Sequence, residues 1–240
     1  MTSSSPPRRT IAAVLLAAAL LGACQRHGPP ESDGLTFPPP SRPVAPIISP
    51  AYSDEATRDR DREAERVFER LGVRPGLRVA DLGAGEGYYT VRLARQLGPG
   101  ATVYAEDVNP AFLKGLQARL TREGFGYVHT VLGAPQDPKL PADSIDLALL
   151  SHVYHEIENP FAFMYRLRRS LAPDGRVAIV EADRPTQSHG TPPVVLRCEM
   201  AAVGYREVDF LPLAPTENYL AVFAAPSQLP PVESIRPCQQ

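Results

Sequence analysis

The segment that decides the fold reads VADLGAGEGY at residues 79–88. Its apolar start has the composition of a short buried strand, and the apolar spacing over residues 88–97 indicates a helix. Between them, Gly83, Gly85 and Gly87 stand at alternate positions. Glycine lets a backbone turn sharply and approach a ligand, and the first turn of a helix has free N–H groups. We therefore expect a ligand-binding strand, loop and helix here.

The spacing of these glycines distinguishes between two kinds of ligand. The loop reads G-x-G-x-G, whereas dinucleotide-binding loops read G-x-G-x-x-G. Asp81 lies two residues before the first glycine, where its carboxylate would repel a pyrophosphate and attract an ammonium group. The expected ligand therefore carries a positively charged amino group.

Apolar runs and turn residues on both sides of this segment alternate between strand and helix patterns. Strands are predicted at 77–82, 101–106, 127–132, 145–150, 176–181, 205–211 and 218–224. Helices are predicted at 53–71, 88–97, 110–122 and 160–172, and a last one begins with the Thr191-Pro192 pair and ends at Gly204.

This alternation predicts an α/β fold with parallel strands and right-handed crossovers. Only about six residues separate the last two strands, which is too short for a crossover, so the last strand should be antiparallel. The expected fold class is a three-layer αβα sandwich around a seven-stranded, mostly parallel sheet with the last strand antiparallel.

A second informative segment, VYAEDVNP, ends the second predicted strand at residues 103–110. An acid at this place can accept hydrogen bonds from both hydroxyls of a ribose. We assign this contact to Asp107 and place Val108 against an adenine ring. Glu106 is the alternative, because a shift of one residue would exchange the two acids.

Together with residues 171–181, these two segments give residues 52–226 a resemblance to the bacterial class I S-adenosylmethionine-dependent methyltransferases. The resemblance implies S-adenosylmethionine as cofactor and in-line methyl transfer as activity. The cofactor-binding residues that it implies are Asp81, Gly83, Ala84, Gly85, Gly87, Tyr88, Asp107, Val108, Gly133 and Ala134. The family often has an adenine-binding acid where Ala134 stands, so Gln136 or Asp137 would have to replace it.

The loop SHVYHE at residues 151–156 follows the fourth strand, at the sheet edge where open α/β folds bind ligands. A base is needed only if the methyl acceptor carries a proton. We expect His155 in this role, His152 as the second candidate and Tyr154 as an orienting hydroxyl. Two alternatives remain. The histidines either bond only to backbone, or ligands from among His152, His155 and Glu156 bind a metal. No metal is expected, because no helix aligns those ligands.

Two further groups border the expected site. Glu181 and Asp183 follow the fifth strand and are either substrate contacts or solvated acids. Tyr88 and Tyr89 either wall the methionine pocket or belong to the core. Few residues remain to cover the site, so we expect a small acceptor.

The N-terminus has the features of a signal peptide. Two arginines precede an apolar run at 11–21, which is shorter than the roughly 20 residues that span a bilayer. LGAC at 21–24 resembles the bacterial lipobox, which implies lipidation of Cys24, attachment to a membrane surface and a location in the cell envelope facing the periplasm. In bacterial lipoproteins, a glutamine such as Gln25 directly after the lipidated cysteine implies the outer membrane. A cleaved signal with an incidental cysteine is the alternative, and twin-arginine export stays open.

Prolines concentrate near the ends, and eight of them fall within residues 25–50. The expected organisation is a signal peptide at 1–24, a Pro-rich linker at 25–50, the methyltransferase domain at 51–226 and a flexible tail at 227–240. The net charge of -2 argues against a nucleic-acid partner. Three cysteines are too few for a disulfide scaffold. The sequence does not specify an oligomeric state.

An export signal conflicts with a cofactor that is made in the cytoplasm, and three hypotheses follow. The protein is an active methyltransferase, either supplied with cofactor outside or retained in the cytoplasm by an inefficient signal. Alternatively it is an anchored binding protein that has lost turnover. A nicotinamide-dependent oxidoreductase is the third, and the glycine spacing and Asp81 disfavour it.

Overall fold

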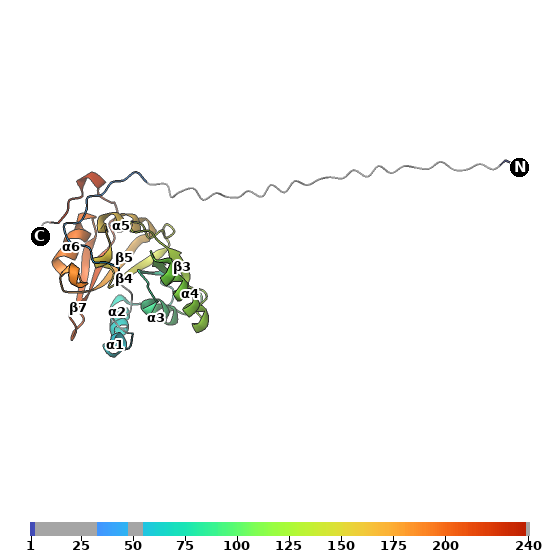
Figure 1. Ribbon diagram of the computed structural model, residues 1–240, viewed down its shortest axis with the longest axis horizontal. Coiled ribbons are helices and arrows are strands. Elements are labelled where there is room, and N and C mark those ends of the chain that lie inside the picture. The colour runs from blue at the N-terminus through green and yellow to red at the C-terminus, as the bar shows by residue number, and fades with distance from the viewer. Residues whose placement is uncertain (3–32, 48–54, 239–240) are drawn as a thin grey trace. The chain divides into compact units, whose positions relative to one another are not determined.

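Seven strands form one sheet, in the order β3-β2-β1-β4-β5-β7-β6 (Figure 1). The computed structural model describes residues 1–2, 33–47 and 55–238, and Leu35–Gln240 is one structural unit. The strands are β1 (Val79–Leu82), β2 (Val103–Asp107), β3 (His129–Leu132), β4 (Ile145–Ser151), β5 (Leu171–Ala182), β6 (Arg206–Pro212) and β7 (Asn218–Ala224).

The predicted fold class is confirmed. Strand β7 pairs antiparallel with both β5 and β6, whereas the pairs among β1 to β5 are parallel. The short connection after β6 allows only a hairpin, so β7 returns between β5 and β6. Residues 173–175, which lie between the predicted helix at 160–172 and the predicted strand at 176–181, belong to β5, where the register with β4 shifts.

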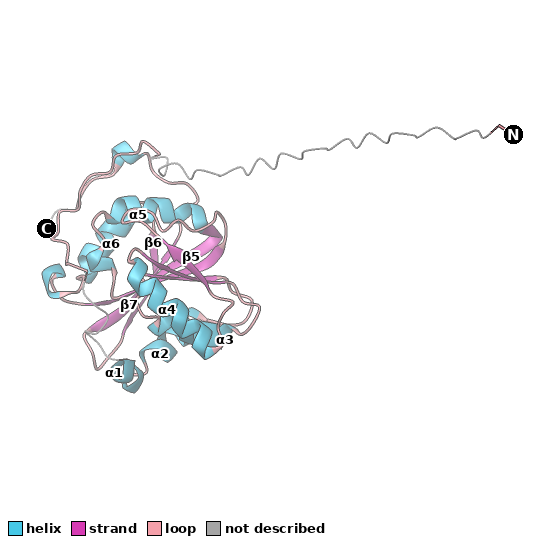
Figure 2. Ribbon diagram, turned by 45° about the vertical axis from the view of Figure 1, so that its right-hand side comes forward, coloured by secondary structure: helices cyan, strands magenta, loops and turns pink. Residues whose placement is uncertain are grey.

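Helices cover both faces of the sheet (Figure 2). The helices are α1 (Glu55–Arg60), α2 (Glu63–Leu71), α3 (Tyr88–Leu97), α4 (Pro110–Glu123), α5 (Pro160–Leu167) and α6 (Pro193–Ala202). Short 3₁₀ helices lie at Tyr154–Glu156, Arg168–Ser170, Thr186–Ser188 and Val232–Ser234. One apolar core packs α5 and α6 on the sheet, and the other packs α2, α3 and α4 on its opposite face.

Side-chain caps mark the starts of α4 and α5. Asn109 and Asn159 accept hydrogen bonds from the N–H groups of Ala111 and Ala162, as their position before proline predicts. The expected cap at Thr191 is wrong: α6 begins later, and within the described chain no side chain caps it. The predicted helix at 53–71 is two helices, because the backbone turns left-handed at Arg62, where φ is 53°.

The predicted Pro-rich linker is not a free tether over all of its length. Phe37 and Ala45 are buried, and Arg42 forms a fully buried ion pair with Glu199 at 3.0 Å. The Ala45 N–H also donates to the His155 carbonyl. Residues 35–47 thus pack on the domain. The segment has no helix or strand of its own, but single side chains from it still enter the core.

The predicted flexible tail is also partly wrong. Ile235 and Cys238 are buried, and Cys238 forms a disulfide with Cys198 on α6. A single disulfide therefore ties the C-terminal segment to the domain, although three cysteines did not indicate a disulfide framework.

The predicted lipidation site, Cys24, and the apolar run before it lie outside the described residues. None of the described helices is both long and apolar enough to span a bilayer.

Candidate active site

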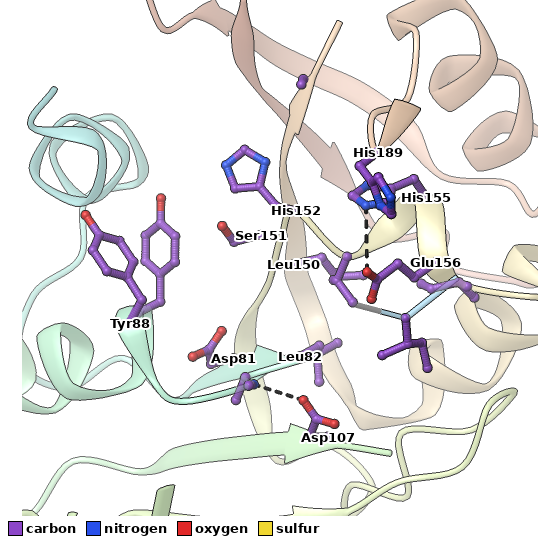
Figure 3. Close-up of a pocket in the computed structure, with 18 of the residues that line it drawn as sticks. Asp81, Leu82, Tyr88, Asp107, Leu150, Ser151, His152, His155, Glu156 and His189 are labelled. Atoms are coloured by element: carbon purple, nitrogen blue, oxygen red, sulfur yellow. Dashed lines mark hydrogen bonds and ion pairs between the residues drawn. The ribbon is translucent and has the colours of Figure 1, made fainter. Parts of the chain in front are cut away.

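A cavity of about 750 Å³ lies at the carboxyl ends of β1, β2 and β4. Figure 3 shows acids and histidines from these strand ends around it. The predicted site residues that line the cavity are Asp81, Gly83, Ala84, Gly85, Tyr88, Asp107, Val108, His152 and His155. Strands that meet at one edge of a parallel sheet thus bring distant parts of the chain to one place.

The glycine loop after β1 requires glycine for two reasons. Gly83, Gly85 and Gly87 have φ of 68°, 53° and 88°, a left-handed backbone that favours glycine. A Cβ on Gly83 would lie 2.5 Å from Cγ2 of Val153, and one on Gly87 would overlap Leu116. Gly87 caps α3, and among the described residues it does not line the cavity.

Asp81 presents a buried carboxylate to the cavity. Its side chain accepts a hydrogen bond of 2.5 Å from the Thr90 hydroxyl and is only 3% exposed. Burial raises the pKa of Asp81 to about 6, because the charged form loses its hydration. A cationic group of a ligand would compensate this buried charge.

The two acids at the end of β2 both line the cavity, so the choice between them stays open. Asp107 accepts hydrogen bonds from the N–H groups of Gly85, at 2.9 Å, and of Asn109, at 2.8 Å. Glu106 is more deeply buried, and its Oε1 has no hydrogen-bond partner among the described residues. Burial, with the nearby Asp107 charge, raises the pKa of Glu106 to about 8. A ligand hydroxyl would satisfy this buried oxygen.

The residues expected after β3 are placed differently. Gly133 and Ala134 are not among the described residues that line the cavity, whereas Pro135 is. Gly133 instead donates its N–H to the backbone of β2, and Ala134 closes a turn with Asp137. Gln136 accepts a hydrogen bond from Arg166 in α5 and Asp137 from Arg169 just after it, and neither is among the described residues that line the cavity.

His155 is held by a buried carboxylate. Its Nδ1 lies 3.0 Å from both carboxylate oxygens of Glu181, which is fully buried. Donation from Nδ1 assigns the tautomer in which Nε2 accepts. His155 therefore does not bond only to backbone, as one alternative had it. Glu181 is fully buried and is absent from the described lining of the cavity, so it is neither a solvated acid nor a substrate contact.

Tyr154 does not have the predicted position. It is fully buried beside Arg42, whose guanidinium carbon lies 5.4 Å from the ring centre, and it is absent from the described lining of the cavity. A 3₁₀ helix has about three residues per turn, so successive side chains point in different directions. Within Tyr154–Glu156, His155 therefore faces the cavity side while Tyr154 enters the core.

A second histidine contacts a carboxylate from the helices before the sheet. Glu63 accepts hydrogen bonds from Arg58, at 2.6 Å, and from the Tyr89 hydroxyl, at 3.1 Å, and its Oε2 lies 3.4 Å from Nε2 of His152. Burial opposes ionisation of Glu63, but His152 and Arg58 outweigh it and lower the pKa to about 2. Arg58 also stacks on Tyr88 at 3.7 Å.

Arg58 and Glu63 both line the cavity, although they were not predicted as site residues. They belong to a run of alternating charges whose pattern is that of a solvated helix face. No local signal distinguishes the partly buried Arg58 and the buried Glu63 from the exposed charges of this run.

Comparison with known proteins identifies a methyltransferase domain at residues 80–179. Nocamycin O-methyltransferase from Saccharothrix syringae is 33% identical over 106 residues, which are 44% of this chain and 38% of that protein. A ubiquinone/menaquinone biosynthesis C-methyltransferase from Vibrio vulnificus is 30% identical over 115 residues, which are 48% of this chain and 44% of that protein. The chain thus spans less than half the length of these two relatives.

The fold is also that of solved methyltransferases. The crystal structure of an S-adenosylmethionine-dependent methyltransferase from Aquifex aeolicus superposes with a TM-score of 0.64 at 19% identity. The match covers 72% of this chain and 99% of that one.

The cavity fits the cofactor of such enzymes. S-adenosylmethionine carries an ammonium group, for which Asp81 offers a buried carboxylate, and ribose hydroxyls, for which Glu106 and Asp107 offer acceptors. The volume of the cavity lies within the roughly 300 to 1,000 Å³ that is usual for small-molecule sites. Residues 80–179 thus match a methyltransferase domain, and the fold and the cavity support S-adenosylmethionine as the cofactor.

Proposed function

We propose that the protein transfers a methyl group from S-adenosylmethionine to a small acceptor held in the same cavity. The observation that carries this proposal is that one cavity is lined both by Asp81 and Asp107 and by His152 and His155. Methyl transfer is an in-line displacement, so the protein chiefly has to align two bound molecules. Such positioning can supply about 7 to 11 kcal/mol of the barrier.

The size of the cavity favours a small acceptor. About 750 Å³ must hold the methionine and adenosine groups and the acceptor together. The relatives include an O-methyltransferase and a C-methyltransferase, which supports an oxygen or carbon nucleophile that loses a proton. An acceptor with a phenol or enol group meets both conditions.

Of the two histidines, we assign the role of proton acceptor to His152. Its side chain is 25% exposed, so that a proton can leave to solvent, whereas that of His155 is 4% exposed. Glu63, whose pKa is lowered to about 2, places a carboxylate beside the His152 ring. Nε2 of His152 lies 3.4 Å from Oε2 of this partner.

The first test combines binding with turnover. Isothermal titration of the full chain should detect S-adenosylmethionine and no comparable affinity for NAD, and tight binding of NAD alone would contradict the proposal. Incubation with methyl-labelled cofactor and a panel of small phenols and enols should then yield labelled product. His152→Gln should reduce kcat with little change in cofactor affinity. Binding without transfer to any acceptor would favour the anchored binding protein.

We also propose that lipidated Cys24 holds the domain at a membrane surface on the periplasmic side. The disulfide between Cys198 and Cys238 supports an oxidising compartment, because cytosolic thiols are kept reduced. Cell fractionation tests this: the protein should sediment with membranes, and Cys24→Ser should release it. A wild-type protein found only in the cytoplasmic fraction would contradict this location.

A further inference from the structure

Three potential metal ligands converge at one end of the cavity. His155, Glu156 and His189 each offer a ligand atom, and these atoms lie within 4.8 Å of one another. Figure 3 shows the three side chains together, apart from His152. They come from two loops: the 3₁₀ helix Tyr154–Glu156 after β4 and the residue that follows the 3₁₀ helix Thr186–Ser188 after β5.

The orientation of His155 is typical of a metal ligand. Its Nδ1 is bonded to the fully buried carboxylate of Glu181, and its Nε2 lies 3.9 Å from Oε1 of Glu156. In metal sites a carboxylate commonly accepts the second N–H of a ligating histidine, which fixes the tautomer and makes the free nitrogen more basic. Glu181 thus prepares Nε2 to bind a cation.

We propose that His155 Nε2, a carboxylate oxygen of Glu156 and the imidazole of His189 bind a divalent transition metal of the zinc class. Two imidazoles and one carboxylate suit zinc or cobalt, whereas magnesium and calcium prefer oxygen ligands alone. Tetrahedral ligands at 2.0 to 2.1 Å from zinc lie roughly 3.3 Å apart, so the side chains have to close by about 1.5 Å at most.

The ligand set is that of an open site rather than a closed structural one. Three protein ligands leave one tetrahedral position for water or an oxygen of the acceptor. All three residues line the cavity that also contains Asp81 and His152. A metal here would hold an acceptor hydroxyl and lower its pKa, and His155 would then serve as ligand while His152 remains the proton acceptor.

This site differs from the one weighed from the sequence, which combined His152 with His155 and Glu156. His152 contacts Glu63 instead, and His189 takes its place, 34 positions after His155 in the chain. The metal site goes beyond the proposed methyl transfer, and it can be tested separately, because metal binding is measured without turnover.

The test uses the full chain, purified in detergent without a histidine tag and dialysed against a chelator. Titration with Co²⁺ should saturate at one ion per chain and give the intense visible absorption of tetrahedral cobalt, which Zn²⁺ should abolish. His155→Ala and His189→Ala should each weaken Co²⁺ binding by at least tenfold. Glu181→Gln, which keeps an acceptor for His155 Nδ1 but removes its negative charge, should weaken Co²⁺ binding by roughly 10- to 100-fold.

His129→Ala is the matched control, because His129 is an exposed histidine on β3, and its Co²⁺ affinity should equal that of the wild type. Circular dichroism checks that each variant is folded. If a histidine variant does not fold, the Co²⁺ affinity of Glu156→Gln tests the site in its place. Absence of a saturable tetrahedral spectrum, or equal affinity in wild type and Glu156→Gln, would overturn the inference. Calorimetry with S-adenosylmethionine on the same samples tests the proposed function separately.

Discussion

Replacing Asp81 by asparagine should stabilise the ligand-free protein while it weakens cofactor binding. Asparagine keeps an oxygen that can accept the hydrogen bond from Thr90, but it removes a buried charge. The pKa of Asp81 is about 6, against an ordinary value of 3.8. At about 1.4 kcal/mol for each pKa unit, ionisation of Asp81 destabilises the folded chain by about 3 kcal/mol at neutral pH.

The sign of this effect gives it a pH dependence. Because the folded pKa lies above the unfolded value, the folded state binds the proton more tightly. The full penalty applies above pH 6 and disappears as the pH falls towards 3.8. The stability advantage of Asp81→Asn should therefore be about 3 kcal/mol at pH 7 and roughly half of that at pH 5.

Urea unfolding at the two pH values measures the advantage, and far-UV circular dichroism follows it because the chain has no tryptophan. Calorimetry on the same variant should give S-adenosylmethionine a Kd raised roughly 10- to 100-fold, the range expected for loss of a charged hydrogen bond. The electrostatic reasoning would be refuted if Asp81→Asn were less stable than the wild type at pH 7. It would also be refuted if the stability advantage of the variant were the same at pH 5 and pH 7.

Asp146→Asn is the matched control for this experiment. The hydrogen bond from Arg78 lowers the pKa of Asp146, so its ionised form stabilises the folded state and the variant should lose stability at pH 7. Asp146 lies at the amino end of β4, away from the cavity, so the cofactor affinity should not change.

Three further outcomes are expected. Gly83→Ala should reduce cofactor affinity and destabilise the fold by about 1 to 3 kcal/mol, because its φ of 68° and the contact with Val153 both disfavour a side chain; calorimetry and urea unfolding measure the two effects. Replacing Cys198 and Cys238 by serine should lower the unfolding free energy by about 2 to 4 kcal/mol in urea without reductant, and the wild type with reductant should match it. Glu63→Gln should cost about 3 to 5 kcal/mol, because its buried arginine partner loses its counter-charge; unchanged unfolding would show that this ion pair does not stabilise the domain.

Several elements could be predicted because their signals are local. The asparagines before proline at 109 and 159 mark helix starts, since the side chain that caps a helix belongs to the residue beside it. Alternation of strand and helix, with a short last connection, is enough to predict the mixed sheet. The loop at 83–87 reveals itself because only glycine adopts its backbone freely.

The candidate site could be predicted only in part. Asp81 and the histidines after β4 lie at strand ends, which a parallel sheet collects at one edge. Tyr154 was misplaced because the direction of a side chain within a short 3₁₀ helix depends on what that helix packs against. Gly133 and Ala134 were misplaced because the loop after β3 folds back on β2.

By itself the sequence determined the order of strands and helices, the glycine loop and the acids at the first two strand ends. Only the tertiary structure decided the partners: Glu63 for His152, 89 residues apart, Glu181 for His155, 26 apart, and Glu199 for Arg42, 157 apart. A local pattern reports which face of an element is apolar, whereas a buried charge finds its counter-charge through strand order and packing. The convergence of His155, Glu156 and His189 therefore became visible only in the folded chain.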